Sequence, residues 1–367
     1  MRVMIISSFA PTLLIFREDM MRAIINKGHE VFSVAPEPEE EWSSKFEELG
    51  IKYFSVKGIE RTGTNPMKDI IGFISLYKII NAIKPDKIFT YQAKTIIYGC
   101  LAARLAGVKE IYVLFGGLGS VFRNQNNSIL RRILIIQYKV ALKCCKKAFF
   151  QNNDDYQVML DYGLTNKNQM VMINGSGVNM EKFVKKPLPR DPVFLFIGRI
   201  IKDKGVMEYV EAAKLVKNKY PEARMQIIGY FDTNPTAIKK EEIQEYLDSG
   251  IIEYLGFVDD VRPFLEKCLV FVLPSYHEGT PKSVLEAMAT GRPIITTNAP
   301  GCRETVVDGI NGFLVPVKNT QILAEKMIWM IEHRNDIIRM AEESYNLCKK
   351  KFDAKNVNDI ILKTMSL

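Results

Sequence analysis

Short runs of β-branched and aromatic residues alternate with amphipathic helical segments along the whole chain, and this alternation restricts the possible folds. The first half contains the runs VMIIS, EVFSVAP, IKYFSV, KIFTYQ, EIYVLFG, KAFFQN and MVMING. The second half contains VFLFIGR, RMQIIGY, IIEYLGF, VFVLPS, PIITTN and FLVPV, and helical patterns such as LLIFREDMMRAIINKG separate the runs. Apolar strands that alternate with helices predict parallel sheets covered on both faces. The predicted fold class is therefore α/β with doubly wound parallel sheets.

The chain is long enough for two such domains, because 367 residues exceed what a single core usually organises. The stretch FVKKPLPRDP, residues 183–192, is the expected linker, since lysines and prolines there precede a new apolar run. We predict a first domain over residues 1–187 and a second over 188–349, with a C-terminal helix at about 350–367 that can pack back on the first. Two facing sheets would leave a cleft at the carboxyl ends of their strands, where ligands bind in such sheets.

Basic residues are concentrated in the first half of the chain. Residues 1–187 contain 26 Lys and Arg against 17 Asp and Glu, while the whole chain carries a formal net charge of +8. The segment ILRRILIIQYKVALKCCKKAFF combines a helical apolar stripe with Arg131, Arg132, Lys139, Lys143, Lys146 and Lys147. Two interpretations remain open, a buried helix with solvated lysines and a surface that faces anionic lipid. Nucleic acid is a weaker candidate, because the sequence contains no nucleic-acid-binding motif.

The N-terminal segment MRVMIISSFAPTLLIF has the composition of a signal peptide, but Ser7, Ser8 and Pro11 interrupt it and no small-residue cleavage site follows. We therefore predict a buried first strand there. Elsewhere no run approaches the roughly 18 uninterrupted apolar residues that would span a bilayer. The six cysteines include no CxxC pair, which argues against disulfides and structural zinc and indicates reduced thiols in a cytoplasmic protein.

The segment HEGTPKSVLEAMATGRPII, residues 277–295, contains a predicted helix start. Thr280 is a suitable N-cap residue and Pro281 a suitable first helical residue. The backbone N–H groups of the first turn, around Lys282 and Ser283, would have no intrahelical acceptor and would carry a partial positive charge. Such a helix end attracts phosphate.

Two carboxylates flank this helix start, with Glu278 just before it and Glu286 in its second turn. Carboxylates repel phosphate, but they accept strong hydrogen bonds from sugar hydroxyls. One glutamate could therefore hold a ribose and the other a transferred sugar, with phosphates between them. The alternative is that both are solvated acids at a helix end.

A second charged pair lies at the end of the first predicted strand of the second domain. The stretch FIGRIIKDKGV contains Arg199 and Lys204 around a loop that leads into a helix. Arg is suited to forked contacts with phosphate and Lys to a point charge, although a solvated loop is the alternative. No D-x-D motif occurs in the chain, and metal-bridged diphosphates usually need paired carboxylates. We expect no metal and no cofactor, with charge stabilisation by Arg199, Lys204 and the helix end.

These residues occur together in a known family. Over about residues 194–317 the sequence resembles the donor domain of retaining GT-B glycosyltransferases, in particular glycosyltransferase family 4, through GRIIKDKG, IIGYFD, YLGFVDDV and LPSYHEGTPKSVLEAMATGRPIITTNAPGCRETVVDGINGFLV. The spacing of Glu278 and Glu286 is the family's E-x7-E signature. The resemblance implies a GT-B fold of two facing Rossmann-like domains, the first for the acceptor and the second for a nucleotide-sugar donor.

The resemblance also implies roles for individual residues. Arg199 and Lys204 would bind the donor diphosphate, and Glu278 would lie near the donor sugar, so these three form the expected catalytic group. Glu286 would hold the ribose hydroxyls, and the base would lie near Val258. The remaining donor-binding residues would be Thr280, Pro281, Lys282, Ser283, Val284 and Leu285.

In the first half the resemblance is looser. The segments MRVMIISSFAPTLLIFREDMMRAI, LFGGLGSVFR and INGSGVNMEKF look like those of transferases that build lipid-linked or surface polysaccharides. Many family members have a histidine where this chain has Phe115, which puts a histidine in that catalytic role in doubt. We expect Arg17 and the loop from Gly116 to Gly119, with Gly116 and Gly117 foremost, to line the acceptor side, although Arg17 could equally be a surface residue near a helix start.

The resulting prediction is a retaining, metal-independent glycosyltransferase. It would transfer a hexose or N-acetylhexosamine from a UDP-sugar to a saccharide acceptor, polyprenyl-diphosphate-linked, at the inner face of the cell membrane in bacterial surface-glycan assembly. The resemblance favours front-face displacement. Two alternatives stay open: a catalytically weak nucleotide-sugar-binding scaffold for a partner enzyme, and an epimerase or isomerase on the same fold that turns over without an acceptor.

Overall fold

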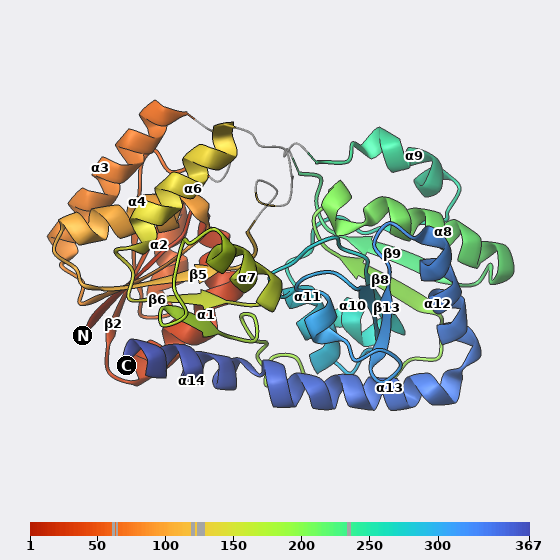
Figure 1. Cartoon of the computed structure of the whole chain (residues 1–367). Coiled ribbons are helices and arrows are strands. Elements are labelled where there is room, and N and C mark those ends of the chain that lie inside the picture. Colours follow the sequence, from red (N-terminus) through yellow and green to blue (C-terminus); the bar gives the residue numbers. More distant parts are fainter. Residues whose placement is uncertain (61–62, 64, 119–121, 123–128, 233–235) are drawn as a thin grey trace. The chain divides into compact units, whose positions relative to one another are not determined.

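A computed structural model describes the whole chain except residues 61–62, 64, 119–121, 123–128 and 233–235 (Figure 1). The chain forms two compact units. Unit 1 comprises Met1–Ser176 together with Ala354–Leu367, and unit 2 comprises Gly177–Asp353. The last helix of the chain therefore belongs to the unit that contains the N-terminus.

The sheet of unit 1 has seven parallel strands in the order β3-β2-β1-β4-β5-β6-β7. Side chains alternate between its two faces, as in any strand: Met4 and Ile6 of β1 belong to one core cluster, while Val3 and Ile5 belong to another. The strands are β1 (Arg2–Ile6), β2 (Glu30–Ala35), β3 (Lys52–Ser55), β4 (Lys87–Tyr91), β5 (Glu110–Phe115), β6 (Lys147–Phe150) and β7 (Met170–Met172).

Helices cover both faces of this sheet. The cluster with Met4 and Ile6 receives side chains from α3 (Pro66–Ile83), α4 (Ala93–Leu105), α6 (Ile129–Leu142) and α7 (Asn153–Asp161). The cluster with Val3 and Ile5 receives side chains from α1 (Ala10–Asn26), α2 (Glu39–Glu47) and the C-terminal α14 (Ala354–Met365). α14 packs against α1 through an apolar face that includes Val357, Ile361, Leu362 and Met365.

The sheet of unit 2 has six parallel strands in the order β10-β9-β8-β11-β12-β13. They are β8 (Val193–Ile197), β9 (Arg224–Ile228), β10 (Glu253–Tyr254), β11 (Val270–Leu273), β12 (Ile294–Thr297) and β13 (Gly312–Val315). The helical segments are η1 (Lys202–Lys204), α8 (Val206–Lys219), α9 (Lys240–Asp248), α10 (Arg262–Lys267), α11 (Lys282–Ala289), η2 (Arg303–Thr305), α12 (Thr320–Glu332), α13 (Arg334–Leu347) and the π-helical η3 (Cys348–Phe352).

In the described residues, each of the thirteen predicted apolar runs overlaps one of the thirteen strands, and both sheets are wholly parallel. The predicted α/β class is confirmed. Each sheet also reverses its strand order once, between β1 and β4 in unit 1 and between β8 and β11 in unit 2. Such a switch point opens a crevice at the carboxyl ends of the strands, where doubly wound sheets bind ligands.

Candidate donor and acceptor sites

The predicted donor-binding residues follow the two strands that flank the switch point of unit 2. Arg199 comes directly after β8, and η1 with Lys204 follows it. Glu278 and the start of α11 come after β11, which is the neighbour of β8 in the sheet. Because β8 and β11 are neighbours, the strand order brings together two segments that lie about 75 residues apart in the chain.

Lys204 and Glu278 form an ion pair between these two segments. Both side chains are largely buried, with 17% and 12% of their surfaces exposed. The pair is supported by backbone contacts, because the hydroxyl of Ser275 donates to Asp203 O at 3.0 Å and the amide of Tyr276 donates to the same oxygen at 2.9 Å. The expected basic and acidic residues thus contact each other directly.

Two glycines allow these loops to approach so closely. Gly205 ends η1 with a φ of +69°, and a Cβ there would overlap the carbonyl oxygen of Pro274 at the end of β11. Gly301 has a φ of +79°, and a Cβ there would overlap the carbonyl oxygens of Glu278 and Gly279. Only glycine meets both demands without strain. The position of the Lys204–Glu278 pair therefore depends on backbone that carries no side chain.

Arg199 forms a second ion pair, with Asp232. Its Nη1 lies 2.7 Å from Asp232 Oδ2, and the Asp232 side chain is only 10% exposed. A guanidinium has five N–H donors, so one carboxylate does not exhaust it. The sequence prediction did not include Asp232. Its signal is an acid soon after β9, a strand that adjoins β8 and ends at the same edge of the sheet.

The start of α11 differs from the predicted start. Thr280 is not the N-cap residue and Pro281 is not the first helical residue, because Pro281 itself occupies the N-cap position with an extended ψ of 114°. The carbonyl of Pro281 accepts from the amides of Val284 at 3.1 Å and Leu285 at 3.3 Å. The amide of Ser283 lies ahead of these two, at the open end of the helix.

α11 is tied to the neighbouring strand at this end, because the hydroxyl of Ser283 donates to Ile197 O, the last residue of β8, at 3.1 Å. Lys282 and Ser283 are partly exposed, whereas Val284 and Leu285 are buried in the core of unit 2. Val258 is partly buried and packs against the same core. The helix end and the two basic residues thus belong to one edge of the sheet.

Glu286 lies in the second turn of α11 with part of its side chain open to solvent. Burial raises the pKa of this carboxyl from 4.5 to about 7, and the charges of Lys282 and Lys182 offset only part of this rise. The carboxylate form is destabilised where it stands. A ligand that donates hydrogen bonds to it would recover some of this free energy.

In unit 1, Arg17 lies on the side of α1 that faces the sheet and is 3% exposed. The alternative that Arg17 is a surface residue is therefore wrong. Its guanidinium lies 5.1 Å from the ring centroid of Tyr91 and 5.7 Å from that of Phe89. Nε and Nη1 are buried without a hydrogen-bond partner in the described part of the chain. Burial lowers the pKa of Arg17 to about 10, so the group stays charged near neutral pH.

A polar cluster that the sequence prediction missed lies at the switch point of unit 1. The side-chain carbonyl of Gln92, just after β4, accepts from the hydroxyls of Ser7 at 2.9 Å and Ser8 at 2.8 Å and from the Ser8 amide at 2.7 Å. Gln92 has a φ of +76°, which is unusual for a residue other than glycine. Strained backbone of this kind is common at ligand sites.

The glycine pair expected on the acceptor side follows β5. Gly116 is exposed and Gly117 has a φ of +110°. Phe115, which stands in place of the family's histidine, is 2% exposed and stacks on Phe150 with ring centroids 5.0 Å apart. Phe115 is therefore a core residue. Gly119, at the end of the expected loop, lies outside the described residues.

Comparison with known proteins agrees with these observations. A family model for glycosyl transferases group 1 matches residues 179–347, and a model for glycosyl transferase 4-like proteins matches residues 8–152. The N,N'-diacetylbacillosaminyl-diphospho-undecaprenol alpha-1,3-N-acetylgalactosaminyltransferase of Campylobacter jejuni is 30% identical over 360 residues, which cover 94% of this chain and 93% of the relative. The chain belongs to the group 1 glycosyltransferases.

Two further similarities extend the comparison of this glycosyltransferase. The UDP-Gal:alpha-D-GlcNAc-diphosphoundecaprenol alpha-1,3-galactosyltransferase of Escherichia coli is 29% identical over 271 residues, 69% of this chain and 68% of the relative. The crystal structure of Anabaena HepE in complex with UDP-glucose superposes with a TM-score of 0.81 at 16% identity and covers 100% of this chain and 99% of HepE. The resemblance to GT-B transferases of family 4 and the GT-B fold are both confirmed.

In the described part of this glycosyltransferase, no helix is long and apolar enough to cross a bilayer. The same residues contain no group of three or more His, Cys, Asp or Glu side chains that could hold a metal ion. The groups described above at the switch point of unit 2 include the two ion pairs, Glu286 and the end of α11.

Proposed function

We propose that this glycosyltransferase moves a hexose or N-acetylhexosamine from a UDP-sugar to a polyprenyl-diphosphate-linked saccharide, with retention of anomeric configuration, during bacterial surface-glycan assembly. The observation that carries the donor part is the Lys204–Glu278 pair beside Arg199 at the switch point of unit 2. The acceptor part is supported by two relatives whose names specify diphospho-undecaprenol acceptors. A lipid-linked acceptor would place the enzyme peripherally at the cytoplasmic face of the membrane.

The donor diphosphate would be held by Arg199 and Lys204. Arg199 can keep its contact with Asp232 while its remaining N–H donors contact phosphate oxygens. Lys204, with three donors, can bridge Glu278 and a phosphate. As the bond to the sugar breaks, charge grows on the leaving diphosphate, and these fixed cations stabilise it more strongly than they do the ground state. No D-x-D motif is available for a metal-dependent route.

The two glutamates would bind hydroxyl groups on opposite sides of the diphosphate. Glu278, whose charge Lys204 balances, would accept hydrogen bonds from the donor sugar. Glu286 would accept them from the ribose, in its ionised form. Ser283 and the other residues of the first turn of α11 would lie against the phosphates or ribose, with the base near Val258. Front-face displacement remains the mechanism that we favour, with the leaving phosphate accepting the acceptor's proton.

On the acceptor side, we propose that Arg17, Gly116 and Gly117 line the site. The guanidinium of Arg17 is buried, charged and has unused donors. A buried cation of this kind is costly unless an anion binds it, and a diphosphate-linked acceptor supplies one.

A transfer assay tests the proposal. Purified enzyme would be incubated with UDP-, GDP- and other activated sugars and a polyprenyl-diphosphate saccharide, and the product linkage read by NMR. We expect transfer from a UDP-sugar with the α configuration kept. Binding of UDP without any turnover would favour the scaffold, and turnover of the donor without an acceptor would favour the epimerase.

A further inference from the structure

Helices α3 and α6 each carry an apolar stripe that faces solvent. On α3 the stripe consists of four residues at helical spacing, Met67, Ile70, Ile71 and Ile74, which are 70%, 56%, 49% and 45% exposed. On α6 it consists of Ile129, Ile133, Ile136 and Val140, which are 77%, 47%, 62% and 49% exposed. Single exposed apolar residues are normal, but two aligned stripes mark an interaction surface.

The fold of unit 1 does not require these stripes. The opposite side of α3 already packs on the sheet through Leu76, Ile80 and Ile83, and the opposite side of α6 does so through Tyr138 and Leu142. Helices that are apolar on both sides are usually buried on both sides. The outward stripes therefore need a second apolar environment, which the described part of unit 1 does not supply.

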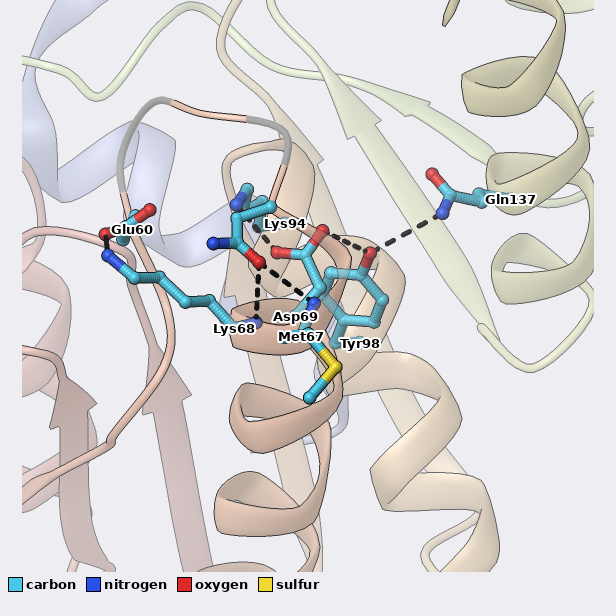
Figure 2. Close-up of polar contacts among 8 residues, drawn as sticks. Glu60, Met67, Lys68, Asp69, Lys94, Tyr98 and Gln137 are labelled. Carbon is cyan, nitrogen blue, oxygen red and sulfur yellow. Dashed lines mark hydrogen bonds and ion pairs between the residues drawn. The ribbon is translucent and has the colours of Figure 1, made fainter.

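A polar network fixes both helices to α4. Tyr98 of α4 donates a hydrogen bond to Asp69 of α3 at 2.9 Å, and the side-chain amide of Gln137 of α6 lies 3.5 Å from the same tyrosine oxygen. Lys94 of α4 adds an ion pair with Asp69 at 2.7 Å, in which both side chains are about 15% exposed (Figure 2). α4 contacts both α3 and α6, so the two stripes are held at a fixed spacing on the same helical layer of unit 1 (Figure 1).

The beginning of the α3 stripe is also held in place. Asn65 caps the helix by accepting hydrogen bonds from the amides of Met67 at 3.0 Å and Lys68 at 3.3 Å, and Pro66 occupies the first turn. Met67 lies in this first turn beside the Asp69 network (Figure 2). The apolar residues therefore begin at a well-defined helix end.

The charges along α6 are basic, whereas the two acids near the start of α3, Asp69 and Glu60, are each paired with a lysine. Residues 129–147 contain six Lys and Arg and no Asp or Glu. Arg132 and Lys139 are exposed on α6, Lys143 is exposed directly after its last residue, and Lys78 is exposed on α3. Arg131 is different, because it hydrogen-bonds to Tyr162 and lies 5.2 Å from the centroid of its ring. An apolar stripe with cations along its edge matches the boundary between acyl chains and phosphates in an anionic bilayer.

We propose that these two stripes and their basic edge form a membrane-docking face, called here the α3/α6 face, that inserts into the outer part of an anionic lipid monolayer. The eight apolar side chains enter the acyl boundary while Arg132, Lys139 and Lys143 contact lipid phosphates. This inference rests on the proposed function in one respect, since it states how an enzyme with a lipid-linked acceptor reaches its substrate. Of the two interpretations of the α6 segment, it adopts the lipid surface.

Vesicle flotation of the full chain without donor or acceptor tests the α3/α6 face. The probes are vesicles of phosphatidylcholine alone and vesicles that also contain phosphatidylglycerol. Ile70→Glu/Ile71→Glu and Ile133→Glu/Ile136→Glu should each lower partitioning by about tenfold or more on both vesicle types, because apolar burial is lost. Arg132→Glu/Lys139→Glu/Lys143→Glu should abolish the preference for phosphatidylglycerol vesicles.

Matched controls come from unit 2. Ile338→Glu changes an isoleucine of α13 that is 50% exposed, and Lys349→Glu/Lys350→Glu reverses two exposed lysines of η3. Both controls should float like the unmodified chain. Thermal unfolding followed by circular dichroism checks that every variant is folded. Equal flotation of the α3/α6 variants and the controls would overturn the proposal.

Two further outcomes separate this inference from the proposed function. The variants should keep transfer to a short-chain, water-soluble diphosphate acceptor but lose transfer to acceptor embedded in vesicles. An enzyme that floats normally but transfers no sugar would refute the proposed function and leave the docking face standing. A concentration-dependent dimer that the same α3 and α6 variants break, with no flotation of the unmodified chain, would instead identify the face as a self-association surface and overturn the proposal.

Discussion

At the scale of single residues, the candidate donor site is made of charged side chains that pair with one another. Lys204 pairs with Glu278, and Arg199 pairs with Asp232. Each pairing compensates two partly buried charges. A buried charge without a partner would destabilise the fold. A diphosphate must therefore compete with, or join, existing contacts. This limits how much affinity any one of these side chains can add.

Lys204→Ala should weaken UDP binding for two reasons. It removes a charge-assisted contact of about 1.5–3 kcal/mol, and it leaves Glu278 uncompensated beside the incoming phosphates. We expect the Kd for UDP, measured by calorimetry, to rise at least about tenfold. Adding Glu278→Gln to this variant should restore part of the loss. The control is Lys202→Ala, which changes an exposed lysine in the same η1 segment; equal losses in both variants would remove Lys204 from the site.

The substitution Glu286→Gln should have opposite effects on folding stability and on UDP binding. The folded-state pKa of about 7 lies above the ordinary 4.5, so between these values the folded chain binds more protons than the unfolded chain. Stability of the unmodified chain is therefore lost as pH rises through this window. The amide variant escapes this loss and should be more stable at pH 8 than the unmodified chain by about 1–3 kcal/mol in denaturant unfolding, with little difference at pH 4.

The same variant should bind UDP more weakly at pH 8, because a neutral amide replaces the carboxylate that we propose as the acceptor of hydrogen bonds from the ribose. For the unmodified chain, affinity should increase as pH rises through about 7. Glu343→Gln changes an exposed glutamate on α13 and should alter neither property. A Glu286→Gln variant that binds UDP normally at every pH would place the ribose elsewhere.

At the scale of elements, the loops at the switch point are held by glycines at positive φ. Gly205 and Gly250 have nearly the same φ, +69° and +68°, but different surroundings. A Cβ at Gly205 would overlap Pro274 O, whereas nothing lies within 4 Å of a Cβ at Gly250. The pair therefore separates the cost of the backbone conformation from the cost of close packing.

Gly250→Ala should cost about 1 kcal/mol of unfolding free energy, the conformational penalty alone. Gly205→Ala should cost at least about 2 kcal/mol more, because the η1 loop must move away from β11. It should also lower UDP affinity, since Lys204 moves with the loop. Urea unfolding and calorimetry measure both effects. Equal costs for the two substitutions would show that the loop can relax and that the contact with Pro274 is unimportant.

The sequence predicts elements more successfully than it predicts site geometry. The thirteen strands were predictable because buried parallel strands are mostly apolar and each lies next to a helical segment in the sequence. The start of α11 was misplaced by one residue because the fixed φ of proline is compatible with both the N-cap and the first helical position, and only ψ decides between them. Asp232 and Gln92 were missed because their partners follow other strands, so their roles appear only once the strand order is known.

At the scale of the whole molecule, the chain leaves unit 1 once, builds all of unit 2, and returns to unit 1 through α14. The apolar face of α14 completes one core of unit 1 together with β1 and α1. The stability of the N-terminal unit therefore depends on residues at the opposite end of the sequence.

Substitutions in α14 should expose this dependence. Ile361 is fully buried in the core of unit 1, while its neighbour Ile360 is 38% exposed. Ile361→Ala should cost about 2–5 kcal/mol, as expected for a cavity in a packed core, and Ile360→Ala should cost less than about 1 kcal/mol. Hydrogen exchange should show the loss of protection in β1 and α1. The affinity of unit 2 for UDP should stay within about twofold, because the core of unit 2 is a separate cluster. Loss of protection confined to α14 would mean that the helix docks on an otherwise self-sufficient core, and that the return of the chain to unit 1 contributes little to its stability.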